Sequence, residues 1–196
     1  MASITNPIED IALFDLDGTL CDYEKALKHS LEKLSSPEEQ PIIFPIRDNS
    51  PVYLRNRTKI IRQSEEWWIN LPKLQLGWDV LAVAQELNYR IMVLTQGPRT
   101  NPSAWSGKKR WADLNLPDVD LTITRDKGLV YGKVLVDDFP EYIERWLTWR
   151  KRGLVIMPTS EENKNYRHPQ VIRYDGTRDC LEEVKEAMLK AKQRNS

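Results

Sequence analysis

The sequence predicts an α/β protein with a doubly wound parallel sheet and a small helical cap inserted after the first strand. Short apolar runs suited to buried strands alternate with segments whose apolar residues recur at helical spacing. Residues 22–76 are predicted to be helical and lie between the first strand and the point where the chain returns to the sheet. We therefore expect them to form the cap. We expect residues 1–21 and 77–196 to form the core domain, with the cap over the carboxyl edge of its sheet.

Composition narrows the class of protein. The 196 residues are 40% hydrophobic, which suits one core domain plus a small insertion, and 29 basic residues balance 29 acidic ones. This balance argues against a nucleic acid polymer or an anionic membrane as partner. Two cysteines, short apolar runs and no basic residue in the first ten favour a cytoplasmic protein. The tryptophans are compatible with either a homodimer face or a core.

The cap region is predicted to hold two helices. The first begins after Asp22 as N-cap and runs to about Leu34, because leucines recur there at helical spacing. Residues 38–51 carry several prolines and are predicted to be an irregular connection. A single helix is predicted over residues 52–68, with Ser64 on its apolar face.

The remaining elements alternate between helix and strand. A turn at residues 72–78 leads into a helix with an apolar stripe, and Pro140 is predicted to open a later helix that Gly153 closes. The other predicted elements are strands at 90–94, 119–124, 134–136, 154–157 and 171–172, and helices at 105–114 and 178–192. The order implies parallel strands joined by helical crossovers.

The first strand, Ile11 to Phe14, is followed by Asp15, Asp17 and a glycine-threonine turn. Two residues apart in an extended segment, the aspartates point to one side, at the strand end where α/β sheets bind ligands. This apolar-strand–DxDGT string resembles the first motif of the haloacid dehalogenase superfamily, whose members are mostly magnesium-dependent phosphatases. The resemblance implies that Asp15 is the nucleophile and Asp17 the general acid/base.

Three other strand ends carry residues that such a phosphatase needs. Because parallel strands end at one edge of a sheet, these residues should meet the two aspartates there. They are Thr95 after the second strand, Lys127 in TRDK after the third, and Asp137 with Asp138 after the fourth. Lys133 is a rival for the lysine role, but it enters the fourth strand and is expected to point away.

A metal ion is predicted at this edge. A carboxylate approaching a phosphate dianion is repelled by roughly 8 kcal/mol at about 4 Å, and a divalent cation reverses that sign. Hard oxygen ligands and a phosphate partner favour Mg²⁺. We expect Asp15 and Asp137 as side-chain ligands, the main-chain carbonyl of Asp17 as another, and Asp138 acting directly or through water.

In-line attack by Asp15 would form an aspartyl-phosphate that water then hydrolyses. Asp17 would protonate the leaving alkoxide and then activate that water. Lys127 and the Thr95 hydroxyl, with backbone N–H groups around Gln96 and Gly97, would hold the phosphoryl oxygens.

Three segments narrow the resemblance to the 5′(3′)-deoxyribonucleotidase family: Thr124 to Asp138, which reads TRDK followed by an aspartate pair; the LTQGP segment at 94–98; and the Trp105…Lys108…Trp111 segment. The resemblance implies a 5′-nucleotidase for deoxynucleoside monophosphates, with an aromatic cap pocket that stacks the base. Gln96 and Phe139 depart from the family pattern at the phosphate or sugar end, so base and sugar preference are not carried over.

The cap offers candidates for binding the base. Phe44, Trp67 and Trp68 are candidate stacking platforms, worth about 1–3 kcal/mol per base, and Arg47 could reach a phosphate or base edge. The alternative for the tryptophans is that they form cap core, since they share a face with Ile60 and Ile61.

Two other functions stay open from the sequence. The chain could hydrolyse another small phosphomonoester, such as a sugar phosphate or phosphoglycolate, in which case we expect a polar cap pocket. It could also be a catalytically silent member that binds nucleotide, although such a protein has no physical need for the four charged residues Asp15, Asp17, Lys127 and Asp137.

Overall fold

The computed structural model describes residues 10–194. Within them, six strands form one sheet in the order β3-β2-β1-β4-β5-β6, and every neighbouring pair is parallel. The predicted doubly wound parallel sheet is therefore confirmed. Its strands are β1 (Ile11–Phe14), β2 (Arg90–Gln96), β3 (Asp120–Thr124), β4 (Val134–Val136), β5 (Leu154–Pro158) and β6 (Val171–Tyr174).

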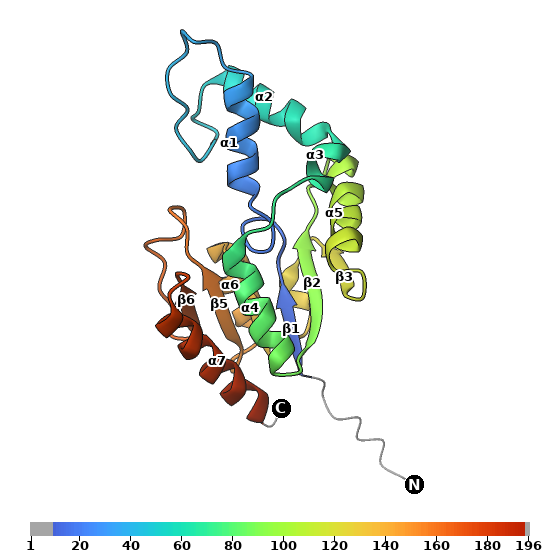
Figure 1. Ribbon diagram of the computed structural model, residues 1–196, viewed down its shortest axis with the longest axis vertical. Coiled ribbons are helices and arrows are strands. Elements are labelled where there is room, and N and C mark those ends of the chain that lie inside the picture. The colour runs from blue at the N-terminus through green and yellow to red at the C-terminus, as the bar shows by residue number, and fades with distance from the viewer. Residues whose placement is uncertain (1–9, 195–196) are drawn as a thin grey trace.

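Helices cover both faces of the sheet, as the buried strand β1 requires. Ala12 and Phe14 join the larger hydrophobic core with α4, α5 and α7, whereas Leu13 joins a second core with α6. Figure 1 shows α4 and α7 in front of the sheet. Alternate side chains of a strand point to opposite faces, so both faces of β1 must be apolar. These helices are α4 (Gln75–Glu86), α5 (Pro102–Asn115), α6 (Pro140–Thr148) and α7 (Arg178–Gln193).

The strand order places the carboxyl ends of β1 and β4 side by side. From β1 the chain builds the sheet outward through β2 to β3, then returns to β4 on the other side of β1. Phe14 pairs with Val136, and the Asp15 N–H donates to the Val136 carbonyl at 2.9 Å. This is the switch point of the sheet, where α/β proteins bind their ligands.

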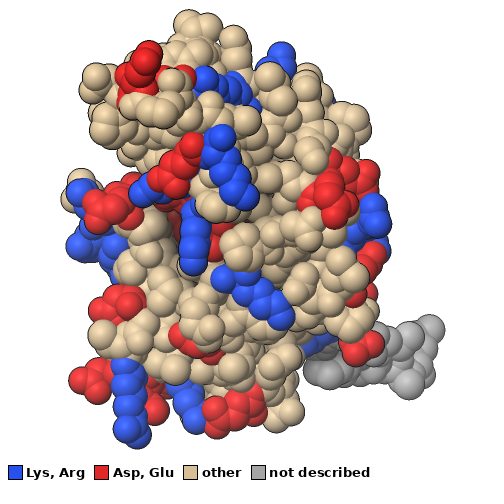
Figure 2. Space-filling view, turned by 45° about the horizontal axis from the view of Figure 1, so that its top comes forward, with Lys and Arg blue, Asp and Glu red and all other residues tan. Residues whose placement is uncertain are grey.

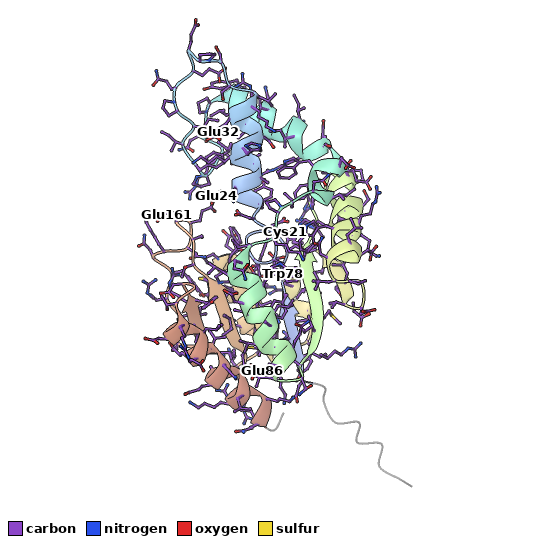
Figure 3. The ribbon with its side chains drawn as sticks, viewed as in Figure 1. Cys21, Glu24, Glu32, Trp78, Glu86 and Glu161 are labelled. Carbon is purple, nitrogen blue, oxygen red and sulfur yellow. The ribbon has the colours of Figure 1, made fainter. Side chains whose placement is uncertain are left out.

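The segment between β1 and α4 lies above this edge of the sheet (Figure 1). It holds three helices, α1 (Tyr23–Lys33), α2 (Val52–Gln63) and α3 (Glu65–Ile69). Two linkers run beside each other at its base: the Asp22 N–H donates to the Pro72 carbonyl at 2.8 Å, and the Leu74 N–H to the Leu20 carbonyl at 3.0 Å. Cys21 and Trp78 mark this crossing in Figure 3, where the Trp78 indole also donates to Leu20.

The prediction of one helix over residues 52–68 is wrong at Ser64. Ser64 has extended backbone angles, and its hydroxyl accepts from the Trp67 N–H at 3.3 Å. A serine at a helix N-cap has non-helical backbone angles, because its hydroxyl accepts from a backbone N–H in the first turn of the new helix. Ser64 therefore ends α2 where it begins α3. The break turns α3 toward α5, where the Trp68 Cβ lies against Gly107.

The helix opened by Pro140 ends at Thr148 rather than at Gly153. The chain turns back after Thr148 so that Gly153 lies against the Trp146 ring, where an added Cβ would stand 2.5 Å from a ring carbon. Helix α5 begins at Pro102, earlier than predicted, because Asn101 caps it by accepting from the Ala104 N–H. The other predicted elements are confirmed to within a few residues, and residues 38–51 are irregular as expected.

Within residues 10–194, no helix is both long and apolar enough to cross a bilayer. Acidic and basic side chains are interspersed over the face that carries the cap, and the described atoms there show no broad patch of a single sign (Figure 2). The two cysteines, Cys21 and Cys180, are both free.

Candidate active site

Lys127 joins the ends of β1 and β4. It lies in the short 3₁₀ turn η1 (Lys127–Leu129), and its ammonium is 2.8 Å from Asp15 Oδ1 and 2.6 Å from Asp137 Oδ2. All three side chains are buried. Burial by itself would lower the pKa of Lys127, but Asp137 and Asp15 outweigh it, so this pKa lies above its ordinary value. Lys127 therefore stays charged and holds two carboxylates together.

A second buried lysine, Lys108 of α5, holds the other half of the site. Its ammonium lies 2.7 Å from Asp17 Oδ2, 3.1 Å from Thr95 Oγ1 and 2.8 Å from the Gln96 carbonyl. Burial raises the pKa of Asp17, and Lys108 opposes that shift. A raised pKa favours the protonated acid that a leaving group needs.

Lys108 was not among the predicted site residues, although one signal could have found it. It lies on the same face of α5 as Ala104 and Trp111, both of which are buried. A lysine is almost never fully buried unless it is paired. A lysine on the apolar stripe of a helix therefore indicates a charged partner, which here is Asp17.

The carboxylates of Asp15, Asp137 and Asp138 form a cluster in which one oxygen of each lies within 4.8 Å of the others. Burial raises the pKa of Asp137 to about 6, against the pull of Lys127. Burial, with Asp137 and Asp15 nearby, raises the pKa of Asp138 well above its usual range. These shifts express the cost of placing like charges together away from water.

This cluster fits a divalent cation with oxygen ligands. Counting Asp17, four carboxylates face the two ammonium groups of Lys108 and Lys127, which leaves two negative charges in excess when all are ionised. Mg²⁺ carries two positive charges, which balance this excess, and it prefers oxygen ligands such as carboxylates. Asp15, Asp137 and Asp138 could each supply a side-chain oxygen.

The turn after β1 is shaped around Asp138. Gly18 has φ of +77°, and a Cβ at that position would stand 2.2 Å from Asp138 Oδ2. The buried Thr19 hydroxyl donates to Asp138 Oδ1 at 3.3 Å. From the loop after β5, the buried Asn163 amide donates to the Asp138 carbonyl at 3.0 Å. Thr19 and Asn163 are thus positioning residues that the sequence did not single out.

The segment predicted to hold phosphate lies beside Lys127. Gln96 lines a cavity of about 260 Å³ together with Lys127, Arg125 and Arg145. The Gly97 N–H donates to the Thr124 carbonyl at 3.4 Å, so this N–H is already hydrogen-bonded to the end of β3. Gly97 is also pressed against Trp105, whose ring an added Cβ would meet at 2.2 Å.

The predicted stacking residues fall into two groups. Trp67 and Trp68 pack with Tyr23 in an aromatic cluster, with ring centroids 5.0–5.9 Å apart. Trp68 is only 4% exposed and belongs to the hydrophobic core, while Trp67 is half-buried. Their indoles donate inside the protein, to Ser30 and to the Arg62 carbonyl. The Lys108 ammonium lies 5.4 Å from the Trp68 ring, so the cluster adjoins the acidic site.

Phe44 and Arg47 lie in the irregular connection between α1 and α2. Phe44 is half-buried and precedes Pro45, whereas Arg47 is exposed and its backbone N–H donates to the Ser50 hydroxyl at 2.9 Å. No described contact joins either residue to the acidic cluster. The structure therefore brings Asp15, Asp17, Thr95, Lys127, Asp137 and Asp138 together and leaves these two cap residues apart from them.

Comparison with known proteins supports the fold. No protein-family model matches the chain, and no curated protein does. Among solved structures, a haloacid dehalogenase-like hydrolase from Burkholderia xenovorans is 14% identical, with a TM-score of 0.55 over 96% of this chain and 100% of its own. A second such hydrolase, from Xanthomonas campestris, is 10% identical, with a TM-score of 0.54 over the same shares of the two chains.

A third solved structure, the haloacid dehalogenase-type hydrolase YfnB from Bacillus subtilis bound to magnesium, is 12% identical to this chain. Its TM-score is 0.56, over 92% of this chain and 98% of its own. The chain therefore has the fold of haloacid dehalogenase-like hydrolases.

Proposed function

We propose that this protein is a magnesium-dependent phosphomonoesterase that works through an aspartyl-phosphate. The observation that carries the proposal is Lys127, held between Asp15 and Asp137 at the switch point of the sheet. A buried lysine between two carboxylates is costly to build, and structural stability alone does not call for it. Positive charge beside a carboxylate nucleophile is what attack on a phosphate dianion requires.

The chain's own residues account for each step. An oxygen of Asp15 forms a bond to phosphorus while the bond from phosphorus to the ester oxygen breaks. Asp17 gives its proton to that leaving oxygen, then takes a proton from the water that attacks the phosphoenzyme, which releases phosphate and restores Asp15. A bound Mg²⁺ would neutralise charge between Asp15 and the phosphoryl oxygens.

Two lysines divide the remaining work in this mechanism. Lys127 stabilises negative charge on the phosphoryl group, and Lys108 orients Asp17 together with the Thr95 hydroxyl. Asp17 Oδ1 is buried and makes no hydrogen bond to any described residue, which suits an atom that waits for a substrate oxygen.

For the substrate, we propose deoxynucleoside monophosphates, with release of the nucleoside. The support is the sequence resemblance at Thr124–Asp138 together with the aromatic cluster of Tyr23, Trp67 and Trp68 beside Lys108. Trp67 and Tyr23 are the half-buried members, whose exposed surface a base could contact.

A second candidate is a smaller phosphomonoester without a base, such as a sugar phosphate or phosphoglycolate. The burial of Trp68 and the internal hydrogen bonds of both indoles favour it, because these rings already have protein partners.

Phosphate release from a substrate panel tests the proposal. The panel holds the deoxynucleoside 5′- and 3′-monophosphates, a sugar phosphate and phosphoglycolate, each assayed with Mg²⁺ and with a chelator. We expect Mg²⁺-dependent release, fastest for a nucleotide, and loss of turnover in Asp15→Asn. Asp113→Asn is the matched control, since Asp113 is exposed and pairs with Lys109 on α5.

Release by Asp15→Asn at the wild-type rate would overturn the mechanism. Preference for the small phosphates, unaffected by Trp67→Ala, would replace the nucleotide with the second candidate.

A further inference from the structure

A larger cavity is lined by Gly128 and Leu129 of η1, the turn that also carries Lys127. It is an open pocket of about 750 Å³ that extends from Gly128 and Leu129 to the loops that precede β4 and β5 and to the end of α7. The mechanism proposed above uses none of the residues that line it. A volume of this size falls in the range of small-molecule sites.

Large apolar side chains that line this cavity are exposed to solvent. Trp149, just after α6, is 65% exposed, and Tyr131 and Leu129 are 42% and 74% exposed. Tryptophan is highly buried on average, and a contiguous group of exposed apolar side chains marks an interaction site or a ligand groove. Two exposed aromatic rings beside one cavity suit a flat, unsaturated ligand.

The polar lining is basic. Among the described residues that line the cavity, none is acidic, and Arg150, Lys151 and Arg194 bring positive charge. The guanidinium of Arg150 donates to the Gly128 carbonyl at 2.7 Å, and that of Arg194 to the Arg152 carbonyl at 3.0 Å. Carbonyl acceptors leave the positive charge of a guanidinium uncompensated. Lys133 also lines the cavity, but its charge is compensated because it pairs with Asp10 at 2.7 Å.

We propose that this cavity is a second binding site, which takes a small organic anion with an aromatic ring. The ring would stack on Trp149, and the anionic group, a phosphate, sulfonate or carboxylate, would face Lys151 and the two arginines. A cavity of this volume suits a small molecule rather than a nucleic acid strand.

The site has a physical connection to Lys127. The three residues of η1 put Lys127 between the active-site carboxylates and place Gly128 and Leu129 in the wall of the cavity. Arg150 holds the Gly128 carbonyl, so a ligand that draws Arg150 toward itself also pulls on this turn.

Fluorescence titration with 8-anilinonaphthalene-1-sulfonate tests the binding site, because this aromatic sulfonate is not a phosphate ester. We expect Trp149→Ala to weaken binding on the order of tenfold, through lost stacking, and Trp149→Phe to retain most of it. Lys151→Glu should weaken binding as well. Lys190→Glu is the matched control, because Lys190 is exposed on α7 and does not line the cavity.

Equal affinity of wild type, Trp149→Ala and Lys151→Glu would overturn the proposal, and so would an equal loss in Lys190→Glu. Displacement of the probe by an eight-nucleotide oligothymidylate at lower concentration than by adenosine monophosphate would assign the cavity to nucleic acid instead. Asp17→Asn should leave probe binding unchanged, which separates this site from the active site. Because the titration needs no turnover, a failure of the proposed phosphatase activity leaves this test intact.

Discussion

The buried Lys108 and the half-buried Asp17 form an ion pair of 2.7 Å, and the same ammonium lies 3.1 Å from Thr95 Oγ1. One side chain of α5 thereby connects the residues that follow β1 with the end of β2. Since Asp17 is the proposed acid and Thr95 a proposed phosphate ligand, Lys108 sets the distance between the proton and the phosphoryl group.

Lys108→Met should lower kcat/KM by about 10²-fold or more, because it removes a positive charge and releases Asp17 and Thr95 from one another. Steady-state phosphate release measures the effect. Lys109→Met is the matched control, because Lys109 is exposed and pairs with Asp113 on its own helix. A Lys108→Met enzyme with wild-type kinetics and normal folding would remove Lys108 from the mechanism.

Lys127→Met should destabilise the protein by about 3–5 kcal/mol in Mg²⁺-free buffer, since it leaves Asp15 and Asp137 facing each other without their shared cation. Urea denaturation followed by circular dichroism measures the free energy of unfolding. Lys164→Met, which breaks only the exposed pair with Glu161, should leave stability almost unchanged. Equal effects of the two substitutions would contradict the buried bridge.

Mg²⁺ should raise the melting temperature of the wild-type protein, because a cation that binds only the folded carboxylate cluster shifts the folding equilibrium. At a hundredfold excess over its dissociation constant, the gain is about 2.7 kcal/mol. Asp137→Asn should reduce the response, since it removes one charged ligand candidate. NaCl at matched ionic strength controls for screening, and an identical response to both salts would argue against a specific site.

Gly18→Ala should impair both folding and activity. The added methyl would meet the Asp138 carboxylate at 2.2 Å, and φ of +77° is unfavourable for alanine. Gly176→Ala is the control, because φ is +89° there as well but the nearest atom, Leu76 Cδ2, lies 3.0 Å away. Thermal melts should show a loss of stability in both variants, whereas only Gly18→Ala should have a lower activity per mole of folded protein. A fully active Gly18→Ala would show that the Asp138 carboxylate can move without consequence.

The spacing of apolar residues was sufficient to predict the fold, because each strand and helix carries its own apolar pattern. The run at Ile11–Phe14 predicted a strand buried on both faces, and Leu13 and Phe14 indeed enter different cores. Ends of elements were harder to predict. The break at Ser64 depends on whether one hydroxyl caps a new helix, and this competition between local hydrogen bonds leaves little trace in an apolar pattern.

The sequence by itself determined the parallel sheet and the strand-end positions of Asp15, Thr95, Lys127 and Asp137, because an apolar run and the motif that follows it are local properties of the chain. Only the tertiary structure decided that Lys108 reaches Asp17, that Trp68 is buried, and that a basic aromatic cavity lies behind η1. Each of these depends on which helix faces meet across long sequence separations, and side-chain packing between distant segments settles that.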